Sequence, residues 1–145
     1  MARQLQELDY HPNVIGGAGL MNKSFLDMVT EEQVNGWYSV GETSLTSTIE
    51  GYPEFMAAYV GKYGSDPESP AICVYAGLQL LKQVIEETGS AASADIAEGL
   101  RAITGCQTII GSMYCDEKQN MLHNTFIKQL HNKKEELITM IEESR

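Results

Sequence analysis

The first forty residues alternate helical segments with short apolar strands. Residues 2–8 have helical spacing, and the apolar run at residues 13–15 predicts a strand. A further helix is expected to begin at Ser24, and an Asn-Gly turn at residues 35–36 leads into a second strand over residues 37–40. This alternation favours an α/β fold in which parallel-sheet elements are flanked by helices.

Beyond residue 50 the apolar positions repeat at helical spacing instead. The pattern predicts helices over residues 52–63, 71–88 and 93–104, each followed by a glycine. The first half of the second of these helices is apolar on nearly every side. We therefore expect it to be sandwiched between other elements.

The last forty residues return to a strand-like pattern. Residues 107–114 and 125–130 are β-prone and are separated by a polar turn at residues 116–120, which indicates a hairpin or a strand pair. Asn132 and Glu135 then have the spacing of a helix capping box, so the pattern predicts a C-terminal helix. The apolar face of that helix would consist of Leu137, Ile138 and Ile141.

Composition and charge narrow the classes of protein that fit this pattern. The chain has 145 residues, 43% of them apolar and 21% charged, as expected for a globular domain that buries a core. Its 20 acidic and 10 basic residues give a net charge of −10, which repels nucleic-acid phosphates, so no nucleic-acid partner is expected. No apolar run approaches the roughly 18 residues of a membrane span. The first residues also lack the apolar segment of a signal peptide.

Motifs for catalysis or metal binding do not stand out. The sequence lacks G-x-S-x-G, H-E-x-x-H and C-x-x-C, so neither an enzymatic activity nor a cofactor is expected. Cys106, Cys115 and His123 could be imagined as zinc ligands, but they lack a recognised spacing. The two cysteines are therefore interpreted as packing residues, and no metal site is expected.

A glycine-rich loop, Gly16-Gly17-Ala18-Gly19-Leu20, follows the first predicted strand. Open α/β sheets bind ligands beyond the carboxyl ends of their strands, and glycines allow the backbone to approach a ligand closely. Gly17, Ala18, Gly19 and Leu20 are therefore the candidate ligand-binding residues. The alternative is a tight strand-to-helix turn without a ligand. That alternative is favoured for the chain taken alone, because a cleft needs a second wall.

The order of several short blocks resembles the later part of type I periplasmic substrate-binding proteins, in particular the branch that binds the branched-chain amino acids Leu, Ile and Val. The glycine loop and its Asn-Lys-Ser continuation are the first block of this resemblance, which extends over residues 2 to about 130. Further blocks are Pro53-Glu54-Phe55, Lys62–Pro67, Tyr75–Gln79, Glu87–Ser90, Thr108–Gly111 and Cys115–Lys118. Members of that family are longer than this chain, so the resemblance is to their C-terminal portion only.

The resemblance implies a division of the chain between two lobes that close over a ligand. Residues 1–42 would be part of the second lobe and would carry the glycine loop, and residues 43–50 would form a hinge-like crossing. Residues 51–122 would be a helix-rich part of the first lobe. Residues 123–145 would contain the return strand and the C-terminal helix.

The function implied by this resemblance is that of a non-catalytic substrate-binding component, or a fragment of one, of an ABC-type transporter for amino acids or similar small polar solutes. A membrane permease would be its partner and the periplasm or the extracellular space its location. The related Leu/Ile/Val binders carry an acidic residue at the position of Ala18, which pairs with the ligand's ammonium group. Ala18 has no charge to offer an amino-acid ligand. Two alternatives stay open: a structural domain without a ligand that self-associates as a homo-oligomer through its apolar helix faces, and a ligand-sensing domain of a larger receptor.

Overall fold

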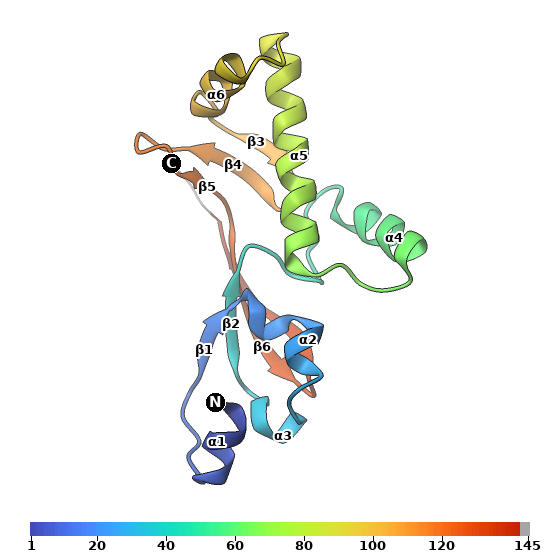
Figure 1. The fold of residues 1–145 in the computed structure, drawn as a ribbon, viewed down its shortest axis with the longest axis vertical. Coiled ribbons are helices and arrows are strands. Elements are labelled where there is room, and N and C mark those ends of the chain that lie inside the picture. The colour runs from blue at the N-terminus through green and yellow to red at the C-terminus, as the bar shows by residue number, and fades with distance from the viewer. Residues whose placement is uncertain (143–145) are drawn as a thin grey trace. The chain divides into compact units, whose positions relative to one another are not determined.

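The computed structural model describes residues 1–142, which divide into two compact units (Figure 1). Unit 1 consists of Met1–Thr46 and Thr125–Ile141, and unit 2 contains Ser47–Asn124. The chain therefore leaves unit 1 after Thr46 and returns to it at Thr125. Within the described residues no helix combines the length and the apolar character needed to span a membrane.

Unit 1 is built on a four-stranded sheet with the strand order β1-β2-β6-β7. Its strands are β1 (Ile15–Gly17), β2 (Tyr38–Gly41), β6 (Thr125–His131) and β7 (Lys134–Ile141). β1 and β2 are parallel, as the alternating pattern predicts, whereas β6 and β7 are antiparallel to their neighbours. The α/β class predicted from the sequence is confirmed.

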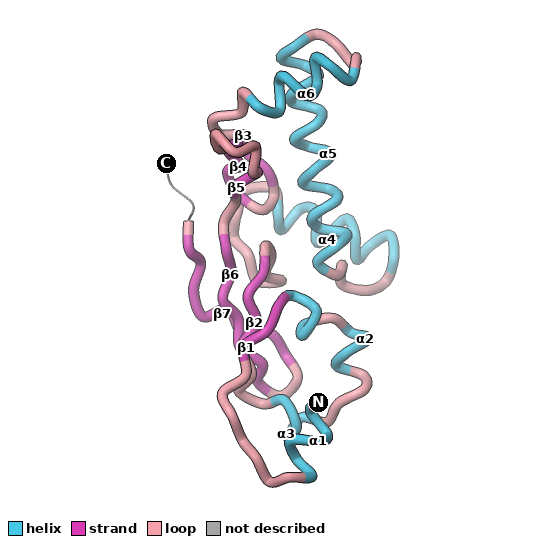
Figure 2. The backbone as a smooth tube through the Cα atoms, turned by 60° about the vertical axis from the view of Figure 1, so that its left-hand side comes forward, coloured by secondary structure: helices cyan, strands magenta, loops and turns pink. Residues whose placement is uncertain are grey.

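Short helices cover one face of this sheet (Figure 2). They are α1 (Ala2–Glu7), the 3-10 helix η1 (Ala18–Met21), α2 (Lys23–Leu26) and α3 (Glu31–Val34). The core beneath them contains Val34, Trp37 and Leu130, which are at most 7% exposed. The rings of Phe25 and Trp37 stack with their centroids 6.4 Å apart. α1 and the helix near Ser24 were predicted, but α2 begins at Lys23 and ends after one turn.

The predicted C-terminal helix is wrong, because the residues after Asn132 form strand β7. Asn132 and Lys133 have left-handed φ angles of 52° and 58°, and the flanking residues His131 and Lys134 pair across the turn. Two successive left-handed residues are the geometry of a type I′ turn, which closes a two-residue β-hairpin. Glu135 consequently faces the interior of unit 1 rather than capping a helix.

Unit 2 contains three helices and a small antiparallel sheet of order β3-β4-β5. The elements are α4 (Tyr52–Tyr63), α5 (Ser69–Thr88), α6 (Ser93–Arg101), β3 (Cys106–Thr108), β4 (Gly111–Cys115) and β5 (Met121–Leu122). The helices lie where their apolar spacing predicts them. The predicted strand over residues 107–114 is instead a tight hairpin of β3 and β4, with Gly111 (φ 100°) at the start of β4. Residues 125–130 do not pair with it but belong to the sheet of unit 1.

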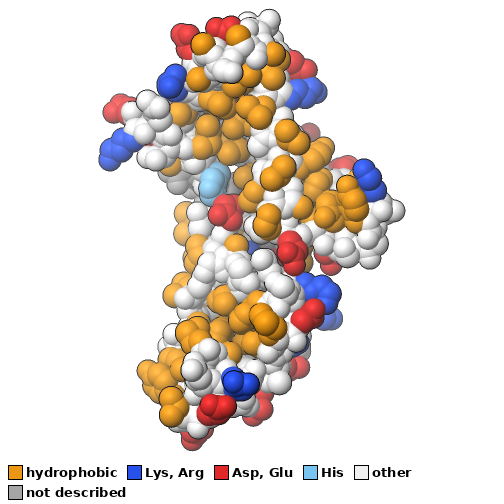
Figure 3. Space-filling view, in the orientation of Figure 1, with side chains coloured by type: hydrophobic (Ala, Val, Ile, Leu, Met, Phe, Trp, Pro, Cys, Tyr) orange, Lys and Arg blue, Asp and Glu red, His pale blue; other side chains and the backbone are white. Residues whose placement is uncertain are grey.

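Helix α5 presents an apolar face on two sides. One face, Ile72, Ala76, Leu80 and Val84, is at most 6% exposed and packs in the core of unit 2. On the other side Val74, Leu78 and Leu81 are 64%, 58% and 36% exposed. Figure 3 shows apolar side chains gathered along this helix. Among the described residues α5 is thus covered on one side, and the expected sandwich is not formed.

Replacing Lys133 by glycine is expected to stabilise the chain by about 0.5–1 kcal/mol. A left-handed conformation costs a non-glycine residue roughly 1–2 kcal/mol, and the entropy that glycine loses on folding offsets part of this gain. The free energy of unfolding in urea measures the effect. Lys133→Ala is the control, since alanine keeps the steric cost and should give no gain. A lower stability for Lys133→Gly than for Lys133→Ala would contradict the turn geometry.

Candidate ligand-binding loop

The glycine-rich loop lies at the carboxyl ends of the two parallel strands. Gly17 ends β1 and lies beside Val40 of β2, and Ala18 begins η1 directly afterwards. The hydroxyl of the buried Ser39 donates a hydrogen bond of 3.0 Å to the carbonyl oxygen of Gly17. This bond fixes the point at which the chain leaves the strand, which the sequence analysis did not anticipate.

Two glycines make room for the side chains of the loop. A Cβ atom on Gly16 would lie 2.6 Å from Cδ1 of Leu20, and a Cβ atom on Gly41 would lie 3.0 Å from Cβ of Ala18. Leu20 can therefore fold back over Gly16, where it packs against the core of unit 1. Ala18 lies directly against the end of β2.

The four candidate residues consequently differ in what they offer a ligand. Gly17 and Gly19 are exposed, and a Cβ atom on either would meet nothing within 4 Å. Ala18 is half-buried against Gly41, and Leu20 contributes mainly to packing. The loop thus presents exposed backbone at Gly17 and Gly19, and its side chains carry no charge. The binding role of all four residues stays a prediction.

Lys128 of β6, which the sequence analysis did not single out as a functional residue, places a charged group near this loop. Its Nζ atom lies 3.7 Å from the position of a Cβ atom on Gly41, and its side chain is only 2% exposed. The signal for its burial was the alternation along β6, since Phe126 and Leu130 on either side of it are both buried. An inward lysine between two inward apolar residues needs a partner, because an isolated buried charge is very costly.

That partner is Glu135 of β7, together with the segment that follows β2. Nζ of Lys128 lies 3.7 Å from Oε2 of Glu135 and donates a 2.7 Å hydrogen bond to the carbonyl oxygen of Thr43. Oε1 of Glu135 accepts hydrogen bonds of 2.7 Å from the hydroxyl of Ser44 and from the backbone N–H of Leu45. Both charges are therefore buried with hydrogen-bonding partners, the condition under which a buried ion pair is tolerated.

Cys106, Cys115 and His123, considered above as zinc ligands, do not form a metal site in the described part of the chain. Among residues 1–142 no group of three or more His, Cys, Asp or Glu side chains is placed to hold a metal ion. Cys106 donates a hydrogen bond of 2.7 Å to Oε1 of Gln83. Burial, and secondarily the negative charge of Glu87, raises the pKa of this thiol above its usual value. Such a shift disfavours the thiolate that metal binding and nucleophilic attack both need.

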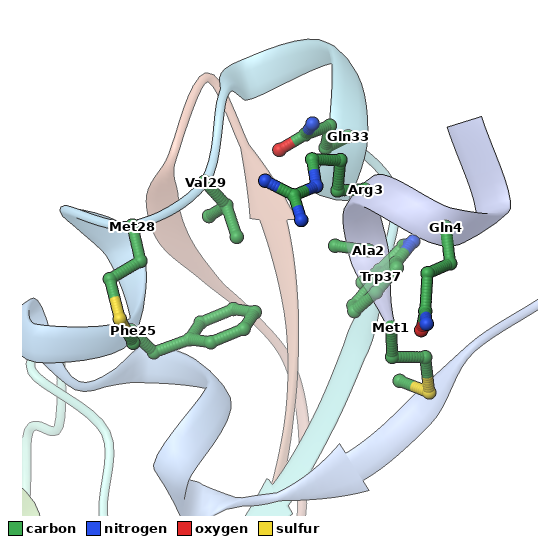
Figure 4. A pocket seen from close by; sticks show the side chains of 9 residues that line it. All are labelled: Met1, Ala2, Arg3, Gln4, Phe25, Met28, Val29, Gln33 and Trp37. Carbon is green, nitrogen blue, oxygen red and sulfur yellow. The ribbon is translucent and has the colours of Figure 1, made fainter. Parts of the chain in front are cut away.

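Unit 1 also contains an open cavity of about 400 Å³, away from the glycine-rich loop (Figure 4). Side chains of α1, α2 and α3 line it together with Trp37. Two of its polar side chains have partners within unit 1, since Arg3 pairs with Glu7 at 3.5 Å and the amide of Gln33 donates to Gln6 at 2.8 Å. This cavity shares no lining residue with the loop, so it adds no wall to the candidate site.

Comparisons with known proteins place the fold. No protein-family model matches this chain, and no curated protein matches its sequence. Solved structures do match: a leucine-binding protein, LivK, from Thermotoga maritima has a TM-score of 0.84 at 20% identity, over 97% of this chain and 40% of its own. The branched-chain amino acid transporter substrate-binding protein LivJ from Streptococcus pneumoniae, solved with isoleucine, has a TM-score of 0.82 at 20% identity, over 98% and 40% of the two chains.

Ligands differ among the similar structures. A solute-binding protein of an ABC transporter from Rhodopseudomonas palustris, solved with 3,4-dihydroxybenzoic acid, has a TM-score of 0.72 at 21% identity, over 97% of this chain and 41% of its own. The chain thus has part of the fold of type I periplasmic binding proteins, as its sequence resemblance predicts. It spans about two fifths of the length of the structures that it matches.

Replacing Gly16 by alanine is expected to destabilise the chain by about 1–3 kcal/mol, because the added methyl group would overlap Leu20 and force it out of its packing. Gly19→Ala is the matched control. Its methyl group would meet open space, so the free energy of unfolding should stay within about 0.5 kcal/mol. Urea denaturation of both variants gives the comparison. Equal effects would contradict the close contact between Gly16 and Leu20.

Proposed function

We propose that this chain is the substrate-binding component of an ABC-type transporter, or part of one, and that it is non-catalytic. The observation that carries the proposal is the match of nearly the whole chain to leucine-binding and branched-chain amino acid-binding proteins, with TM-scores of 0.84 and 0.82. The identity is 20% and the chain spans 40% of those proteins, so the match shows the fold, and the ligand and the partners of this chain are proposed.

The proposed ligand is an amino acid or a similar small polar solute, bound at the glycine-rich loop. Gly17 and Gly19 have exposed backbone at the carboxyl ends of two parallel strands, which is the usual ligand position in open α/β sheets. Ala18 brings no charge to this position. An amino-acid ammonium group would therefore lack a charge-assisted hydrogen bond from the loop, and we expect weak binding by this chain.

A membrane permease is the proposed partner, and the periplasm or the extracellular space the proposed location. Both follow from the transporter proteins that share the fold. A ligand-sensing domain of a larger receptor would use the same loop and the same ligand class. Binding of this chain to a permease, measured in detergent or in nanodiscs, separates the two roles.

Amino-acid binding at the loop is tested by isothermal titration and thermal shift with leucine, isoleucine, valine and 3,4-dihydroxybenzoate. Ala18→Asp should bind the amino acids at least tenfold more tightly than the unmodified chain, since a hydrogen bond to a charged group is worth about 1.5–3 kcal/mol. Ala18→Asn, of the same size but neutral, is the control and should gain less. If none of these four compounds gives heat or a thermal shift with any of the three proteins, the proposed ligand class is wrong.

A second candidate is a self-associating structural domain, and the exposed face of α5 favours it. Val74, Leu78 and Leu81 form an uncharged stripe on this helix, and exposed apolar surfaces of this kind mark protein–protein contacts. A homodimer in which two copies cover these faces is the expected assembly.

Light scattering at micromolar concentration tests this assembly. The unmodified chain should have twice the mass of a single chain, and Leu78→Glu should reduce it to the monomer mass, because the introduced carboxylate would have to be desolvated in the interface. A stable monomer of the unmodified chain would exclude the homodimer.

A further inference from the structure

The buried pair Lys128–Glu135 contacts a segment that is remote from it in sequence. Ser44 and Leu45 are separated from Glu135 by 91 and 90 residues, yet both donate to the same carboxylate oxygen. Lys128 adds a hydrogen bond to the carbonyl group of Thr43. Three consecutive residues of the chain are thus held by two side chains of the β6–β7 hairpin.

These three residues occupy a particular place in the chain path. Thr43–Leu45 come just before the first crossing out of unit 1, between Thr46 and Ser47, and Lys128 comes shortly after the second crossing, between Asn124 and Thr125. They also follow Gly41, which lies against Ala18 of the candidate loop. A change in the path of residues 43–45 would therefore be transmitted to the surface against which the loop rests.

We propose that Lys128 and Glu135 are positioning residues that clamp Thr43–Leu45 to the β6–β7 hairpin and thereby hold Gly41 against Ala18 of the candidate ligand-binding loop. Their role in ligand binding rests on the proposed function, whereas the clamp itself does not. The ion pair thus joins the segment just before the first crossing to strand β6, which begins directly after the second crossing. From the sequence alone Glu135 is predicted to cap a helix, and its contacts with Ser44 and Leu45 are not predicted.

Charged groups at this place select one backbone path for residues 43–45, because they form specific hydrogen bonds with it. Replacing a buried ion pair by apolar residues of similar size is often neutral or even stabilising, so such a pair contributes little to stability as a whole. What apolar side chains cannot replace is the set of hydrogen bonds to the Thr43 carbonyl group and to the Leu45 N–H. The pair therefore fixes the path of this backbone segment rather than simply filling the core.

The experiment is backbone hydrogen exchange of the ligand-free chain, followed by NMR. In the double variant Lys128→Met/Glu135→Leu the amide of Leu45 should exchange at least tenfold faster, while the amides that join β2 to β6 change less than twofold. Lys134→Met/Glu136→Gln is the matched control, since it removes one positive and one negative charge from exposed positions of the same hairpin and should leave Leu45 unchanged.

Two results would overturn the clamp: an unchanged Leu45 amide in the double variant, or equal acceleration of Leu45 and of the β2–β6 amides, which would mean that the pair stabilises unit 1 as a whole. If the double variant does not fold, Ser44→Ala decides. It removes the hydroxyl that donates to Glu135 and accepts from the N–H of Thr46, and should accelerate exchange at Leu45 several-fold; no acceleration would refute the clamp. Because no ligand is present, failure of the clamp is distinct from failure to bind amino acids.

Discussion

Two opposite charges, on Lys128 and Glu135, are buried side by side in unit 1 and constrain the structure around them. Each charge can stay inside only while it faces the other and the backbone of residues 43–45. A shift of one residue in the pairing of β6 with β7 would turn one of these side chains to the opposite face of the sheet. The hairpin and residues 43–45 are therefore connected through this buried pair.

The glycine-rich loop combines closely packed positions with exposed backbone. Gly16 and Gly41 are small because Leu20 and Ala18 occupy the adjacent space. Gly17, by contrast, has open space beside it and an exposed backbone. The loop is therefore packed at Gly16 and Ala18 and exposed at Gly17 and Gly19, an arrangement typical of a loop held by a rigid scaffold.

Unit 2 illustrates a fold that is present in part. Its three strands are short, and its long helix α5 has one apolar face in the core and another exposed. The similar structures are about two and a half times as long as the matched region, since the match covers 40% of their chains. Among the described residues nothing covers the second apolar face of α5. Further polypeptide in a longer binding protein could cover this face, and so could a second copy of the chain.

By itself the sequence determined the local elements: helices over residues 52–63, 71–88 and 93–104, the last of which ends at Arg101 in the structure, the two parallel strands, and the resemblance to type I periplasmic binding proteins. These depend on periodicity and on short motifs, which are local properties of the chain. Only the tertiary structure decided that the residues after Asn132 form a strand. Leu137, Ile138 and Ile141 have a spacing that suits a helix, but the left-handed turn at residues 132–133 and the pairing with β6 prevail. It also decided that Lys128 and Glu135 are inside, because their partners lie some 90 residues away in the sequence, and no local pattern records such contacts.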